Sequence, residues 1–210
     1  DHRMNYVSRG KSPRIHPEAR VAHSAVISGD VEIGPNCYIG HHAVIVDEGG
    51  PIRIGAHCVV MDSAVIRGVP NLDTVLGNHV LVGPRAHLVG CRIDNDVFLA
   101  TGATVFSGAH LGEGAEVRIN GVVHIRTNLP AHATVPIGWV AVGTPARILP
   151  AEQHDDIWAI QKPLDFPRFV FDMERPPAGV SMMAELMPRY ARSLRARHAD
   201  DHPVRDEQAG

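Results

Sequence analysis

The sequence has few cysteines and no long apolar run. Its three cysteines, Cys37, Cys58 and Cys91, include no Cys-x-x-Cys pair, so they do not form a disulfide framework. Sparse, unpaired cysteines are typical of a reducing compartment, and we therefore expect a cytoplasmic protein. No apolar stretch approaches the roughly 20 residues that a helix needs to span a bilayer, so we expect no membrane partner.

Positive charge and aromatic residues are also scarce. The formal net charge is −3 at pH 7, with 20 Lys and Arg residues against 23 Asp and Glu residues. Nucleic-acid-binding domains usually carry a basic patch, so we expect no nucleic-acid partner. Aromatic residues make up 5% of the chain, whereas glycine occurs 20 times. This combination favours a fold with thin layers and many turns.

An aliphatic residue recurs every six residues along most of the chain. The hexads Ile33–Tyr38 (IGPNCY) and Ile39–Val44 (IGHHAV) show the unit, which has a small residue at its fifth place. A period of six fits neither a helix nor a simple alternating strand. It is typical of a triangular coil of three short strands, in which each coil buries its apolar layer against its neighbours. The aliphatic column comprises Ile15, Val21, Ile27, Ile33, Ile39, Ile45, Ile54, Val60, Ile66, Leu76, Val82, Leu88, Ile93, Leu99, Val105, Leu111, Val117, Val123, Leu129, Val135 and Ala141.

This repeat predicts an all-β fold, a left-handed parallel β-helix of about seven coils over residues 15–148. Residues 1–14 would form a lead, and residues 149–210 a C-terminal extension with a flexible tail. We expect helices in this extension at about 150–162 and 181–198, on either side of an irregular proline-containing segment. Two enlarged corners, 47–51 and 68–74, interrupt the spacing in successive coils. Corner loops of a solenoid usually carry its specificity.

Residues 29–149 resemble the γ-carbonic anhydrase family of hexapeptide-repeat proteins. The motifs that carry this resemblance are Gly29–Gly34 (GDVEIG), Gly50–Gly55 (GPIRIG), Val82-Gly83 with Gly90-Cys91, and Val142–Ala146 (VGTPA). The resemblance implies a homotrimer with each site between two subunits. It also implies a zinc ion held by three histidines, whose bound water would have a pKa near 7.

The positions that the resemblance assigns to the zinc ligands carry no histidine. They fall at Arg67, Pro84 and Val89, and none of these side chains binds zinc in the usual way. The family's supporting Arg and Gln fall at Val46 and Met61. We therefore expect no zinc at the family's site.

Five residues around these positions are the candidates for function. Arg67 could bind a carboxylate through its planar guanidinium, or it could pair with Asp62 or Glu48 instead. Asp62, Glu48 and His87 are candidate acid–base groups, and together with Arg67 they form the candidate catalytic set. Arg67 and His124 are the candidate substrate-binding residues, although His124 also fits a buried histidine at a subunit interface.

The sequence leaves several functions open, and it does not decide whether the protein is an enzyme. The first is a trimeric γ-carbonic-anhydrase-like protein without the usual zinc site, which binds or transforms a small carboxylate or acyl compound at the subunit interface. The second is a hexapeptide acyltransferase using acyl-CoA, although the enlarged corners lack the expected histidine. The third is a non-catalytic structural or assembly subunit. A zinc-dependent carbonic anhydrase is the least favoured interpretation.

Overall fold

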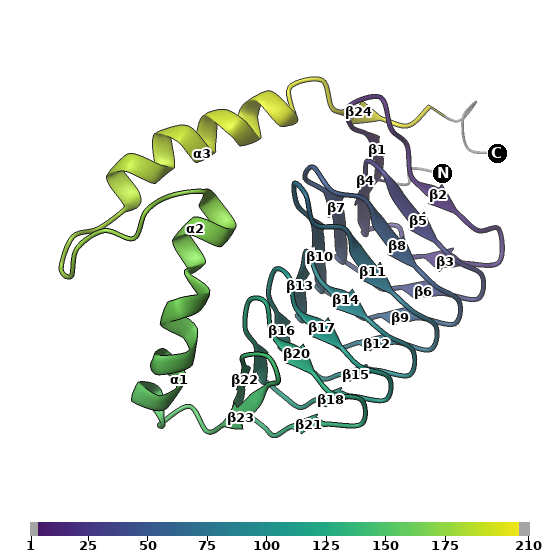
Figure 1. Ribbon diagram of the computed structural model, residues 1–210. Coiled ribbons are helices and arrows are strands. Elements are labelled where there is room, and N and C mark those ends of the chain that lie inside the picture. The colour runs from purple at the N-terminus through teal and green to yellow at the C-terminus, as the bar shows by residue number, and fades with distance from the viewer. Residues whose placement is uncertain (1–3, 206–210) are drawn as a thin grey trace.

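The computed structural model describes residues 4–205, and most of them form a solenoid with three parallel sheets (Figure 1). The longest sheet contains β1 (Met4–Val7), β4 (Val26–Ser28), β7 (Val44–Asp47), β10 (Val65–Gly68), β13 (His87–Val89), β16 (Thr104–Val105), β19 (Val122–Val123) and β22 (Val140–Val142), with β23 (Arg147–Leu149) and β24 (His202–Pro203) antiparallel at its ends. We call it the ten-stranded sheet.

The other two sheets complete the triangular coils. One contains β2 (Arg14–Ile15), β5 (Val31–Ile33), β8 (Ile52–Ile54), β11 (Thr74–Leu76), β14 (Arg92–Ile93), β17 (His110–Leu111) and β20 (Asn128–Leu129). The other contains β3 (Arg20–Val21), β6 (Tyr38–Ile39), β9 (Val59–Val60), β12 (Leu81–Val82), β15 (Phe98–Leu99), β18 (Glu116–Val117) and β21 (Thr134–Val135).

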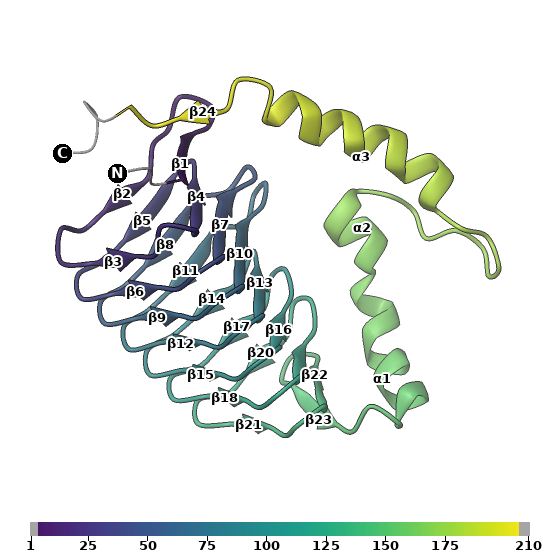
Figure 2. The same cartoon turned by 180° about the vertical axis from the view of Figure 1, so that it is seen from behind.

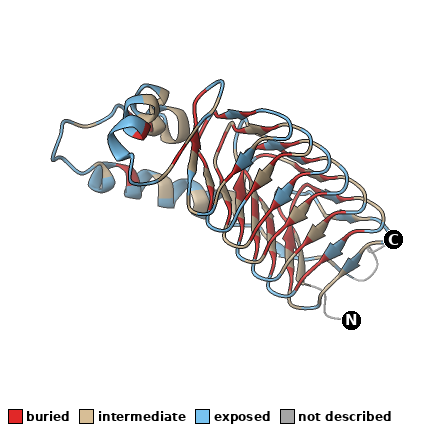
Figure 3. Ribbon diagram, turned by 90° about the horizontal axis from the view of Figure 1, so that it is seen from below, coloured by how far each residue is buried: buried red, intermediate tan, exposed pale blue. Residues whose placement is uncertain are grey.

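The stacking of the coils confirms the predicted parallel β-solenoid. Ile66 pairs in register with Ile45 on one side and Leu88 on the other, and all three side chains are fully buried. Figure 3 shows the buried inner face of each coil and the exposed corners around it. The segment predicted as a lead adds a strand, because β1 pairs with β4 in parallel. The left-handed sense of the coil stays a prediction.

Several histidines occupy the corners of the coils. His42, His57, His79 and His132 have φ angles of 57°, 56°, 57° and 61°. Few side chains tolerate this left-handed conformation, and histidine is among the types enriched there. These four histidines therefore have a structural role as turn residues.

The C-terminal extension runs back along the solenoid from its last coil to its first (Figure 2). It contains α1 (His154–Gln161), the short 3₁₀ helix η1 (Lys162–Leu164), α2 (Phe166–Phe171) and α3 (Met183–Arg197). Ile157 packs on Val142 and Leu149 at one end, and β24 pairs with β1 at the other. We call residues 150–205 the strap.

Two expectations about the strap need correction. The segment predicted as irregular includes η1 and α2, where Phe166 and Phe171 pack edge to face with ring centroids 5.7 Å apart. The predicted flexible tail includes β24, so this part is held by the sheet, and residues 206–210 lie outside the described range. Among the described residues, no helix is long and apolar enough to cross a bilayer.

Candidate functional site

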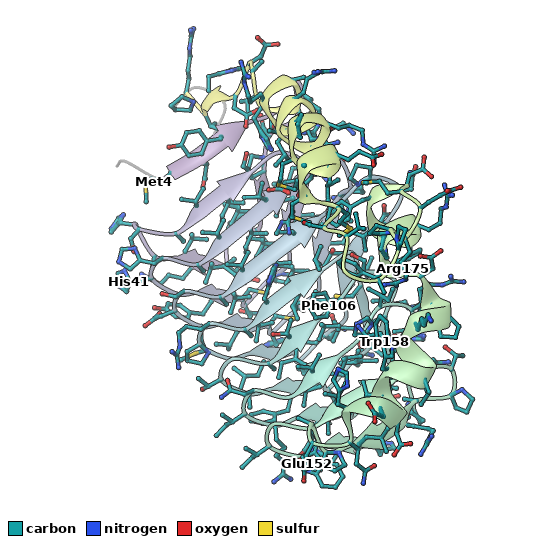
Figure 4. All side chains as sticks on the ribbon, turned by 90° about the vertical axis from the view of Figure 1, so that its left-hand side faces the viewer. Met4, His41, Phe106, Glu152, Trp158 and Arg175 are labelled. Atoms are coloured by element: carbon teal, nitrogen blue, oxygen red, sulfur yellow. The ribbon has the colours of Figure 1, made fainter. Side chains whose placement is uncertain are left out.

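A cavity of about 530 Å³ lies between the ten-stranded sheet and the strap. The solenoid contributes Glu48, Arg67, His87 and Phe106 to its lining, together with the corner 69–72. The strap contributes residues of α2 and α3. Figure 4 labels Phe106, which lies on the face of the solenoid beneath the helices of the strap. The cavity therefore joins segments that are far apart in the sequence.

The strand β10 sets the direction of Arg67. Side chains alternate along a strand, so the buried Ile66 points into the solenoid while Arg67 points outward. In register, Arg67 pairs with Val46 on β7 and with Val89 on β13. Its carbonyl oxygen accepts hydrogen bonds from the Thr74 hydroxyl at 2.7 Å and the Gly90 N–H at 3.1 Å. The backbone at Arg67 is thus fixed on both sides.

The enlarged corner after β7 brings Glu48 to Arg67. The carboxylate of Asp47 accepts the Gly49 N–H at 2.8 Å and pairs with Arg9 at 2.7 Å, which fixes the corner. The Glu48 N–H donates to the carbonyl of Gly68 at 2.7 Å. Glu48 is therefore held beside the end of β10 by its own backbone.

Arg67 and Glu48 form a partly buried ion pair. One carboxylate oxygen of Glu48 accepts from Nη2 of Arg67 at 2.5 Å and from Nε at 3.1 Å. The Tyr190 hydroxyl of α3 lies 3.4 Å from the same Nη2. Burial opposes the charge of Arg67, but Glu48 and Tyr190 outweigh this effect and raise the pKa of the guanidinium. Arg67 therefore stays protonated. Of the two partners that the sequence suggested for Arg67, a ligand or a carboxylate of the protein, the structure shows the second, and that carboxylate is Glu48.

His87 lines the same cavity as an uncharged side chain. Its Nε2 is buried and has no hydrogen-bond partner among residues 4–205. Burial lowers the pKa of His87, the charge of Arg67 lowers it further, and Glu48 acts in the opposite direction. The imidazole is therefore neutral at pH 7 and can offer a hydrogen bond without a charge.

We expect His87→Gln to reduce the acid sensitivity of the fold. An unfolded histidine has a pKa of about 6.5, above that of His87 in the folded protein. Below pH 6.5 the unfolded chain therefore binds the proton first, and the free energy of unfolding falls until the pH passes the folded pKa. Urea unfolding at pH 7.5 and pH 5 should show a smaller loss for His87→Gln than for the wild type. His154→Gln, at an exposed position of α1, is the control and should match the wild type. Equal losses in all three proteins would contradict this prediction.

The remaining candidates lie outside the cavity lining. Asp62 is exposed in the turn before β10, where its carboxylate accepts the His41 N–H at 2.9 Å. His124 follows β19 and packs on Phe106 with ring centroids 5.7 Å apart. Its Nδ1 is buried without a partner in the described part of the chain, and burial lowers its pKa. The structure thus brings Arg67, Glu48 and His87 together, places His124 beside Phe106 but outside the lining, and leaves Asp62 at another corner.

Comparisons with known proteins relate the chain to hexapeptide-repeat proteins. The model of the bacterial transferase hexapeptide (six repeats) matches residues 12–47. The carnitine operon protein CaiE of Escherichia coli is 29% identical over 152 residues, which cover 72% of this chain and 74% of CaiE. The mitochondrial gamma carbonic anhydrase 1 of Arabidopsis thaliana is 30% identical over 145 residues, or 66% of this chain, which spans only 50% of that relative. These matches show a hexapeptide-repeat protein that is similar to the γ-carbonic anhydrases and to CaiE.

A solved structure supports the fold of this hexapeptide-repeat protein. It is the crystal structure of a Bacillus cereus protein described as a candidate acetyltransferase, with 28% sequence identity and a TM-score of 0.55. The likeness covers 78% of this chain and 93% of that one.

The residues at the family's zinc position do not fit a zinc ion. Arg67 is cationic and paired with Glu48, and Pro84 and Val89 carry no donor atom in their side chains. Within residues 4–205, no group of three or more His, Cys, Asp or Glu side chains is arranged to hold a metal ion. That zinc does not bind at this position stays a prediction from the donor set.

Sequence reasoning missed the contribution of the strap. Phe166, Phe169 and Phe171 of α2 line the cavity with Phe106, so four of the five phenylalanines in the chain gather there. Tyr190 and the buried Leu186 come from α3. The sequence did contain a signal for this contribution, the three phenylalanines within residues 166–171 of a chain poor in aromatic residues. Such side chains are seldom left without an apolar contact.

Proposed function

We propose that the cavity binds a small carboxylate or acyl compound, with Arg67 at its polar end. The observation that carries this proposal is the composition of the lining. Arg67, Glu48 and His87 share the lining with phenylalanine, valine and leucine side chains, and further polar side chains come from the strap. Ligand sites are typically about 300–1,000 Å³ in volume and mostly apolar, with a few convergent polar groups.

Arg67→Ala should weaken the binding of a ligand that fits this cavity by at least about tenfold, because a hydrogen bond from a charged group contributes about 1.5–3 kcal/mol. Suitable probes are 3-phenylpropionate and 3-phenylpropionamide, titrated by isothermal calorimetry. Each has a carbonyl group and an aromatic end to pack on the phenylalanines.

Arg92→Ala is the matched control, since Arg92 is an exposed arginine on a different sheet. The affinity of the Arg92→Ala variant for both probes should equal that of the wild type. Wild-type protein that binds neither probe would argue against the proposal and favour a structural or assembly role. Unchanged affinity in Arg67→Ala would remove Arg67 as the anchor.

Acyl transfer from acyl-CoA is the second candidate function. It is favoured by the likeness to the Bacillus cereus protein described as a candidate acetyltransferase. His87 is the candidate base for such a reaction, because its neutral imidazole lines the cavity. The enlarged corners at 47–51 and 68–74 carry no histidine.

We further propose that the protein is a homotrimer, as the resemblance implies. Ile119 in one coil and Ile137 and Trp139 in the next lie near one corner, with 46%, 64% and 36% of their surfaces exposed. Exposed apolar patches often mark contacts between proteins. Light scattering should give three times the chain mass of 22.7 kDa.

Ile137→Asp should shift the trimer towards single chains, because the contact would bury an unpaired charge. Val180→Asp, in the loop before α3, is the control and should keep the wild-type mass, since Val180 is also exposed, at 56%. A wild-type mass of one chain would contradict the trimer.

A further inference from the structure

Glu48 already neutralises Arg67 inside the cavity. The two side chains are only 20% and 25% exposed, and two nitrogens of the guanidinium contact one carboxylate oxygen. A close pair that is largely shielded from water presents little net charge to a third group. The polar end of the cavity therefore lacks the free positive charge that would favour an anionic ligand.

Arg67 nevertheless has hydrogen-bond donors left. A guanidinium carries five N–H groups, and Nε and Nη2 are the nitrogens that contact Glu48 and Tyr190. Nη1 donates to no residue in the described part of the chain, which leaves its two N–H groups for a ligand. A carbonyl oxygen is an acceptor of the kind that such donors bind.

His87 adds a second uncharged hydrogen-bonding group. Its buried Nε2 lacks a partner, and a buried polar atom without a hydrogen bond costs free energy. This nitrogen has almost no exposed surface, so a ligand group would remove that cost only if the imidazole turned towards the cavity. Because the imidazole is neutral, it would not attract a carboxylate by charge.

We infer that the cavity takes an acyl compound with an uncharged carbonyl group, an amide or an ester, in preference to a free carboxylate. This inference rests on the proposed function of the cavity and narrows its ligand class. The carbonyl oxygen would accept from Arg67 without displacing Glu48, and the acyl group would pack on the phenylalanines. A carboxylate would instead bring a second negative charge beside Glu48, and the two would repel strongly where water is scarce.

Two arginines of the strap could instead favour a carboxylate ligand. Arg189 and Arg197 line the cavity from α3. Arg189 is exposed and donates to the Phe171 carbonyl, and Arg197 donates to the Ser193 hydroxyl at 3.4 Å. Water and salt screen the charge of the exposed Arg189 fully and that of the half-buried Arg197 in part. A carboxylate held by them would bind equally well with or without Glu48, so a change at Glu48 separates the two cases.

The test compares 3-phenylpropionamide with 3-phenylpropionate on the full-length wild type and on Glu48→Gln. We expect the wild type to bind the amide at least tenfold more tightly. Glu48→Gln removes the negative charge but keeps the size of the side chain, so the carboxylate should gain at least tenfold and overtake the amide. Glu32→Gln, at an exposed glutamate on β5, should keep the wild-type ratio. Circular dichroism in the titration buffer confirms that the variants are folded.

Each result has a distinct meaning. A wild type that prefers the carboxylate overturns this inference and leaves the proposed function in place. A ratio unchanged in folded Glu48→Gln also overturns it, because the preference would not come from Glu48. No binding of either probe to the wild type overturns the proposed function itself. If Glu48→Gln does not fold, the wild-type ratio alone still decides the preference.

Discussion

Gly68→Ala should destabilise the protein by about 3 kcal/mol or more and should also disrupt the cavity. A Cβ atom at Gly68 would lie 1.8 Å from the carbonyl oxygen of Gly50. Both atoms belong to or adjoin the backbone, so neither can rotate away, and the strand or the corner must move. The corner that would move also carries Glu48, whose N–H is bonded to the Gly68 carbonyl. Urea unfolding measures the loss of stability, and titration with the two probes measures the loss of binding.

Gly10→Ala separates this steric clash from the general cost of replacing a glycine. Gly10 has a φ of 71°, and no atom lies within 4 Å of the position of its Cβ. Alanine there should cost only the roughly 1–2 kcal/mol of a left-handed conformation. An equal loss in the two variants would mean that the close approach of β10 to the corner does not constrain the fold.

The solenoid could be predicted because its contacts repeat. The hexad position of Ile45, Ile66 and Leu88 is occupied by an aliphatic residue in coil after coil, and each occurrence indicates the same inward direction. The floor of the cavity was predictable for the same reason. Once Ile66 is known to point inward, Arg67 must point outward, next to the residue in register on the neighbouring coil.

The placement of Asp62 differs from the predicted site. Asp62 was grouped with Arg67 because both lie around the positions that the resemblance assigns to the zinc ligands. It lies instead in the turn that precedes β10, where its carboxylate accepts the His41 N–H. Glu48 is farther away in sequence, but it lies at the same corner one coil earlier. In a solenoid, the same corner of the next coil is the near neighbour.

The strap could not be placed from sequence because it lacks the repeat. Its helices could be expected from their end signals, but nothing in them indicates the face they cover. The bond between Arg67 and Tyr190 joins residues 123 positions apart. The direction of the strap depends on its two attachments, Ile157 on Val142 at one end and β24 on β1 at the other. Neither attachment has a sequence pattern that specifies its partner.

Ile66→Ala should cost about 2–5 kcal/mol, because it opens a hole in the middle of the solenoid. Ile66 is fully buried, and its neighbours above and below, Ile45 and Leu88, are fully buried too. Large-to-small changes at such sites lose the transfer free energy of the removed atoms and leave a cavity that the surrounding chain fills only in part. The loss should appear in urea unfolding as a lower midpoint with an unchanged slope, which would show that the folded state stays compact.

Ile15→Ala is the comparison that tests why the cost is large. It makes the same chemical change in β2, an edge strand with a single neighbour, and Ile15 is only half-buried. In a solenoid each apolar layer contacts only the layers beside it, so an end layer has one interface to lose and a middle layer has two. We expect Ile15→Ala to cost less than half as much as Ile66→Ala. If both variants lost the same stability, the position of a coil in the stack would not matter, and the core would have to be treated as one cooperative unit rather than as layers stabilised by their nearest neighbours.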